Sequence, residues 1–100
     1  MKTPAGEEGH NPSNAVVGTT VKEIVDYNAQ RLWLRIKNLS QTVCYVGLTQ
    51  GVSAANGYHL NQNEVLVIDL TNPYSGPIYG ITSVSTANLR IIEVSRAGSQ

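Results

Sequence analysis

The sequence predicts an all-β protein, a single antiparallel β-sandwich of seven to eight strands with jelly-roll or Ig-like connections. Valine, isoleucine and threonine make up 26 of the 100 residues, and such β-branched side chains fit a pleated sheet better than a helix. No segment carries the apolar spacing of an amphipathic helix over eleven or more residues. Short strand patterns recur along the chain with turn residues between them, which is typical of sandwiches and small barrels.

Eight segments are expected to form these strands, the first two as one strand or as two. They are residues 16–17, 21–27, 31–37, 42–48, 58–60, 64–70, 78–84 and 88–94. The clearest is 31–37, where leucine or isoleucine at even positions alternates with Trp33 and three cations at odd positions. Period-two alternation predicts a half-buried strand with the even positions in the core. In the segment 64–70, the unbroken apolar run 65–68 favours burial on both faces.

The two ends of the chain differ from this domain, which we expect to span 15–95. Residues 1–14 contain no large apolar side chain after Met1, so they cannot bury enough surface to offset their ordering entropy. They are predicted to form a flexible N-terminal arm, and 96–100 a short tail. Assembly with a partner would make 1–14 an anchoring arm, in which prolines limit the conformations lost on docking. The residues considered for this role are Pro4, Glu7, Glu8 and Pro12.

Charge and composition exclude several classes of function. Seven basic and seven acidic residues cancel, and 14% of the chain is charged. Neither a nucleic-acid binder nor a polybasic membrane binder is expected from this balance. One cysteine and two scattered histidines predict no disulfide and no metal site, and no cofactor motif is present. The start of the chain has no apolar signal segment, so we expect synthesis in a cytoplasm.

The sequence contains one candidate catalytic group. Cys44 and His59, with Asp69 as a third group, could in principle form the nucleophile and base of a thiol hydrolase. The alternative is a small buried hydrophobe at Cys44, which is the usual role of a free cysteine. No glycine loop of the oxyanion type accompanies the pair, so the sequence favours a non-enzymatic protein without catalytic residues.

Trp33 is the most informative single residue, because the alternation directs it outward beside Arg31 and Arg35. Three interpretations stay open: a subunit interface, a ligand platform with cation–π support, and packing under a loop of the same domain. Tyr58 and Tyr74 lie beside turns and could add to a recognition surface.

The order of several segments resembles a pattern of small virion proteins of tailed bacteriophages. The matching stretches are AQRLWLRIKNLSQTVCYVGL at 29–48, AANGYHL at 54–60, GPIYGIT at 76–82 and TANLRIIE at 86–93. The likeness covers about residues 17–95, and its motifs serve turns and core rather than a catalytic site. It implies a structural β-sandwich of the capsid decoration or head-fibre type, exposed on the virion exterior and bound to the major capsid protein or another virion protein. A homotrimer is the favoured oligomer.

Two alternatives accompany this expectation. The protein could be a carbohydrate-binding module that attaches to a host glycan, with Trp33 or the loop tyrosines as stacking platforms. It could also be a structural component of the neck or tail.

Overall fold

The computed structural model describes residues 8–9 and 12–96, which form nine strands and contain no helix. Eight of the strands correspond to the segments expected from the sequence, and the ninth is a short addition at the start. The strands are β1 (Glu8–Gly9), β2 (Ser13–Val17), β3 (Lys22–Val25), β4 (Arg31–Asn38), β5 (Cys44–Gly47), β6 (Tyr58–Leu60), β7 (Val65–Ile68), β8 (Ile78–Ile81) and β9 (Ala87–Ser95).

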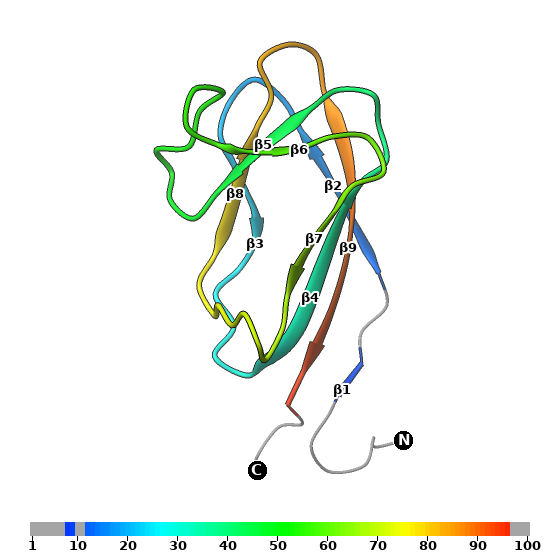
Figure 1. The fold of residues 1–100 in the computed structure, drawn as a ribbon, viewed down its shortest axis with the longest axis vertical. Coiled ribbons are helices and arrows are strands. Elements are labelled where there is room, and N and C mark those ends of the chain that lie inside the picture. Colours follow the sequence, from blue (N-terminus) through cyan, green and yellow to red (C-terminus); the bar gives the residue numbers. More distant parts are fainter. Residues whose placement is uncertain (1–7, 10–11, 97–100) are drawn as a thin grey trace.

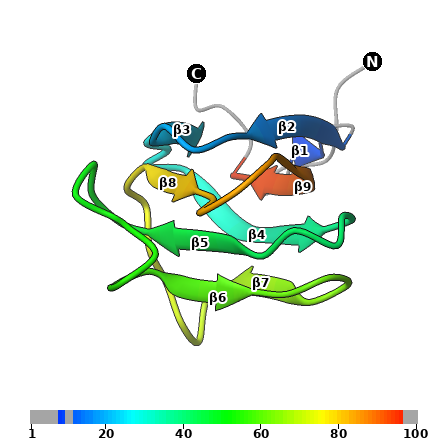
Figure 2. The ribbon, with the colours of Figure 1, turned by 90° about the horizontal axis from the view of Figure 1, so that it is seen from above.

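The strands form two antiparallel sheets that pack face to face as a β-sandwich (Figures 1 and 2). Sheet A has the order β1-β9-β4-β7, and β2 also pairs with β9. Strands β1 and β2 pair with successive parts of β9, so they occupy one edge position of a sheet four strands wide. Sheet B has the order β3-β8-β5-β6.

The pairing is nested, and this decides between the two predicted topologies. Strand β2 pairs with β9, β3 with β8, β4 with β7, and β5 with β6. The chain therefore resembles one long hairpin, and it is rolled so that successive pairs fall alternately in sheets A and B. These pairs also lie side by side. Strand β9 pairs with β4 in sheet A and β8 pairs with β5 in sheet B, which completes the two four-stranded layers. This is the connectivity of a jelly roll.

The core lies between the two sheets and is built from alternate residues of each strand. Leu34 and Ile36 of β4 have no exposed surface, and neither do Ile78 of β8 and Leu89 of β9. Leu60 of β6 is 1% exposed, so both sheets contribute to the core. These even positions of β4 were predicted to face the core. Apolar burial of this extent provides the main stabilisation of a domain of this size.

Strand β7 differs from its predicted environment. The apolar run 65–68 was expected to be buried on both faces, but β7 pairs only with β4 and forms an edge of sheet A. Val65 is 43% exposed, and the next three residues are half-buried. The prediction was wrong because a continuous apolar run does not distinguish a central strand from an edge strand with a partly covered outer face.

The regular structure begins before the predicted domain boundary at residue 15. Ser13 and Asn14 belong to β2 and pair with Ile91 and Arg90, while β1 pairs with the last two residues of β9. Pro12 lies exposed between these two strands. The rest of the predicted arm, including Pro4, Glu7 and the side chain of Glu8, lies outside the described residues, as do residues 97–100 of the tail.

Candidate functional site

A β-bulge at the start of β4 changes the face on which Arg31 lies. Arg31 pairs with Ser95 and Trp33 pairs with the adjacent Val94, so Leu32 is the extra residue in β4. The Arg31 side chain is 1% exposed, although the alternation placed it on the outer face with Trp33. That assignment of Arg31 to an exposed platform was wrong, because regular alternation does not hold across a bulge.

The buried guanidinium of Arg31 connects four segments of the chain. Its Nε donates to Glu93 Oε2 at 2.5 Å, and its Nη2 donates to the carbonyl oxygen of Asp26 at 2.7 Å. Nη1 donates to the carbonyl oxygens of Tyr74 and Gly76, at 2.8 and 3.1 Å. A buried charge requires such pairing, because desolvation of an unpaired ion is costly. Arg31 is therefore a structural residue of the sandwich interior.

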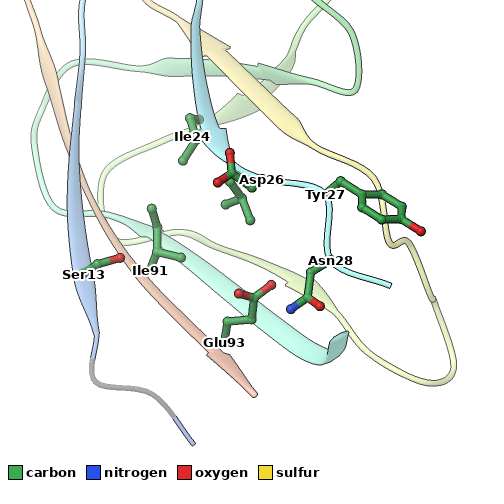
Figure 3. A pocket seen from close by; sticks show the side chains of 8 residues that line it. Ser13, Ile24, Asp26, Tyr27, Asn28, Ile91 and Glu93 are labelled. Atoms are coloured by element: carbon green, nitrogen blue, oxygen red, sulfur yellow. The ribbon is translucent and has the colours of Figure 1, made fainter. Parts of the chain in front are cut away.

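A pocket of about 310 Å³ opens beside this network, between the edge strands β2 and β3 (Figure 3). The carboxylates of Asp26 and Glu93 line it from different sheets, and Asn28 holds its place by donating from Nδ2 to Ser95 Oγ at 2.8 Å. The ring of Tyr27 is directed away from the other labelled side chains in Figure 3 and is 65% exposed. The remaining lining residues are Ser13, Ile24, Val25 and Ile91.

This pocket was not predicted from the sequence. Asp26 and Glu93 are separated by 66 residues of sequence. The nested pairing brings them together, and no local pattern reports it. Two carboxylates above apolar walls can accept hydrogen bonds from hydroxyl or ammonium groups, but the Glu93 carboxylate is already engaged by Arg31.

The outer face of sheet A, here called the A face, carries Trp33 as predicted. The guanidinium carbon of Arg35 lies 4.7 Å from the centre of the Trp33 ring, which is a cation–π contact. Trp33 is half-buried and Arg35 is exposed. The register assigns to the A face the residues Asn14, Val16, Trp33, Arg35, Lys37, Val65, Val67, Asn88, Arg90, Ile92 and Val94.

A hollow of about 310 Å³ lies at the end of the A face next to Trp33. Leu32, the extra residue of the bulge, lines it together with Trp33 and with Asp69 to Thr71, which follow β7. Leu70 is 72% exposed, the largest exposure among the apolar side chains of this surface. Trp33 is therefore partly accessible from solvent, beside the loop that follows β7.

The two loop tyrosines have different environments. Tyr58 is 61% exposed at the start of the edge strand β6 and stays a candidate for contact with a partner. Tyr74 is half-buried, packs against the core, and donates from its hydroxyl to the carbonyl oxygen of Pro77 at 2.9 Å. The proposed recognition role of Tyr74 is thus replaced by a structural one.

Cys44 and His59 do not form a catalytic pair. Cys44 faces the core with no exposed surface, whereas His59 lies opposite Tyr45 and contacts its ring edge-on at 4.8 Å. Since neighbouring strand residues point to opposite faces, the thiol and the imidazole are separated by sheet B. Burial raises the pKa of Cys44 to about 11, so the thiol is neutral at physiological pH.

The outer face of sheet B presents an aromatic row. Tyr45 lies between His59 and Ile81, and Tyr79 lies opposite Gly47, against which the side chain of Val52 packs. Tyr45, Tyr79 and Ile81 are half-buried and His59 is exposed. This row becomes visible only from the register of the strands.

The part of the chain that the structure describes contains neither a metal-binding cluster nor a membrane-spanning helix. No group of three or more histidine, cysteine, aspartate or glutamate side chains is arranged to hold a metal ion. No helix that could span a membrane occurs among the same residues.

Comparison of the chain with protein-family models, with curated proteins and with solved structures found no match.

Proposed function

We propose that this protein is a non-enzymatic structural component of a bacteriophage virion. It decorates or projects from the capsid exterior and is attached to the major capsid protein or to another virion component. The observation that supports this most directly is the placement of the residues on which the resemblance to phage virion proteins rests, because they occupy positions that build the sandwich.

Three of these residues illustrate the point. Asn38 is fully buried and bonds across to sheet B. A Cβ at Gly57 would lie 2.6 Å from Tyr45 Cβ, and one at Gly80 would lie 2.5 Å from Ile24 Cδ1. Residues that close packing requires are consistent with a scaffold shared with the phage virion proteins. None of the three belongs to a group of catalytic side chains. Jelly rolls occur in viral capsid domains and in lectins, so the fold adds support by analogy.

The test is attachment to particles produced without this protein. We expect the purified protein to sediment with such particles, to saturate at a fixed ratio to the major capsid protein, and to be located on the exterior by immunogold electron microscopy. A β-sandwich of similar size and charge from an unrelated source is the control for trapping in the pellet. Protein that stays in the supernatant at every concentration would contradict the proposal.

The resemblance also leads us to propose a closed homo-oligomer, with a trimer favoured. A sandwich of this size exposes much of its surface and gains stability from association. Multi-angle light scattering at high micromolar concentration is expected to give three times the chain mass. A monomer under these conditions would remove the trimer from the proposal without affecting attachment to particles.

The aromatic row on sheet B favours a second candidate function, a carbohydrate-binding module for host attachment. Tyrosine rings on an open sheet face can stack on the apolar face of a sugar ring. A glycan array should then give selective binding that Tyr79→Ala abolishes and Tyr27→Ala, which removes an exposed tyrosine elsewhere, leaves unchanged. Absence of any selective signal with the wild-type protein would eliminate this candidate.

A further inference from the structure

We infer that the A face is a docking surface for a partner protein that presents carboxylates together with apolar side chains. The inference deepens the proposed function, since it gives the chemistry of the virion component to which the protein attaches. It rests on that function only for the identity of the partner, because the surface itself is defined by the register of sheet A.

The A face has apolar side chains on both sides of β4. Ile92 and Val94 of β9 and Val67 of β7 are half-buried beside Trp33 and Arg35, and Val65, opposite Lys37, is 43% exposed. The hollow next to Trp33 adds a concave site at one end. An aromatic residue and an arginine beside valine and isoleucine is the composition typical of an interface centre.

The charge of the A face then limits which partner surface can cover it. Arg35 and Lys37 lie two residues apart on β4, and Arg90 on β9 is directly opposite Lys37. All three are exposed, and like charges in directly opposite positions destabilise a sheet. The one ion pair among the described residues is Arg31–Glu93, which lies inside the sandwich. Arg35 contacts the Trp33 ring and Arg90 donates to Asn14 Oδ1, but none of the three cations is paired with a described carboxylate, and an acidic partner would compensate them.

Asp69 provides the only described carboxylate at the rim of the A face, beside Trp33. It accepts from Thr71 Oγ1 at 2.7 Å and from the Thr71 and Asn72 amides at 3.0 and 3.1 Å. These hydrogen bonds hold the pKa of Asp69 below its ordinary value, mainly through Thr71, with a smaller contribution from Arg35. Its charge is thus used within its own turn, and the face as a whole stays basic.

A second copy of the chain that meets the A face with its own A face is a poor occupant. In a twofold contact the same patch meets itself, so the three cations of one copy would face those of the other. The complementary surface instead places carboxylates about 7 Å apart, the spacing of Arg35 and Lys37 along an extended strand. Apolar side chains between these carboxylates would contact Val67 and Ile92, and a larger one would enter the hollow beside Trp33.

Trp33 makes the test direct, because it is the only tryptophan of the chain and lies on the surface in question. The probe is a capped ten-residue peptide of alternating glutamate and valine, and its lysine–valine counterpart is the control. The acidic peptide is expected to shift Trp33 emission to the blue and to reduce quenching by acrylamide. The effect should weaken as salt rises from 50 to about 300 mM.

The matched variants carry equal changes in net charge. Arg35→Glu/Lys37→Glu reverses two cations of the A face, and Lys22→Glu/Arg96→Glu reverses two exposed cations elsewhere. We expect the first to weaken peptide binding and attachment to particles about tenfold or more, and the second to leave both unchanged. Thermal melting of each variant establishes that it is folded, and Arg35→Gln/Lys37→Gln replaces the reversal variant if that one is not.

Several outcomes would overturn the inference. These are failure of the acidic peptide to protect Trp33, equal loss in both double variants, stronger protection by single-stranded DNA, and protection of Trp33 by self-association alone. The particle experiment separates the two proposals. Wild-type protein that binds the peptide but not particles would contradict the virion function, whereas equal attachment of wild type and the Arg35/Lys37 variant would contradict the role of the A face.

Discussion

The buried side chain of Asn38 joins the two sheets at Leu60. Its Nδ2 donates to the Leu60 carbonyl oxygen and to that of Thr42, both at 2.8 Å, while Oδ1 accepts from the amide and hydroxyl of Ser40 at 2.9 Å. Asn38 is the last residue of β4, and Arg31 is the first. Strand β4 therefore has a buried polar residue at each end that bonds to segments in or next to sheet B. The side chains between these two residues pack in the apolar core.

We expect Arg31→Met to lower the free energy of unfolding by about 3 kcal/mol, because it leaves the Glu93 carboxylate in a partly buried position without its cation. Urea denaturation measures the change. The double variant Arg31→Met/Glu93→Leu should recover part of the loss, since no unpaired charge remains. Arg96→Met is the exposed control, and a loss of equal size there would contradict the assignment of Arg31 to a buried network.

Asn38→Ala is expected to destabilise the protein by about 3 kcal/mol, since it removes four hydrogen bonds and leaves buried carbonyl groups without a donor. Asn88→Ala is the matched control, because Asn88 is an exposed strand residue on the A face. We expect the control to change stability by less than about 0.5 kcal/mol. Similar losses in the two variants would show that the connection between the sheets contributes little.

The buried thiol of Cys44 should make stability fall with alkaline pH. The folded protein holds the thiol proton up to about pH 11, whereas the unfolded chain releases it near the ordinary value of 9.0. The unfolded state therefore binds fewer protons between these values, and the free energy of unfolding decreases as the pH rises through them, by up to about 2–3 kcal/mol. The quantity to measure is the difference between wild type and Cys44→Ala, because contributions common to both proteins cancel in it.

A labelling experiment tests the same burial at neutral pH. A thiol reagent should react slowly with the native protein and rapidly in denaturant, because the thiol is neutral and inaccessible in the fold. Fast labelling of the native protein would place the thiol at the surface and would reopen a chemical role for it.

Truncation at two points should separate anchoring from folding. Removal of 1–14 deletes β1 and the first two residue pairs between β2 and β9, so we expect a clear drop in melting temperature. Removal of 1–7 leaves every described strand in place, and its melting temperature should match that of the full chain. If these residues anchor the protein, the shorter truncation lowers occupancy on particles; equal occupancy would assign attachment to the sandwich.

The sequence was sufficient for the strands because their signal is local. Alternation in β4 and the turn residues between segments located all eight main strands, and the burial of Leu34 and Ile36 followed. The environment of Arg31 could not be predicted, since one extra residue at Leu32 reverses the face of what precedes it. The shared pocket of Asp26 and Glu93 depends on which strands become neighbours, and that is a property of the whole chain.

The position of β9 has a consequence for the order of events during synthesis. Of the strands that the structure describes, β9 is synthesised last, yet it lies inside sheet A between β2 and β4 and supplies Glu93 to Arg31. Until β9 emerges from the ribosome, β2 has no partner strand in sheet A and the guanidinium of Arg31 lacks the Glu93 carboxylate. Contacts between such distant segments form slowly. Sheet A is thus expected to close only after β9 has left the ribosome.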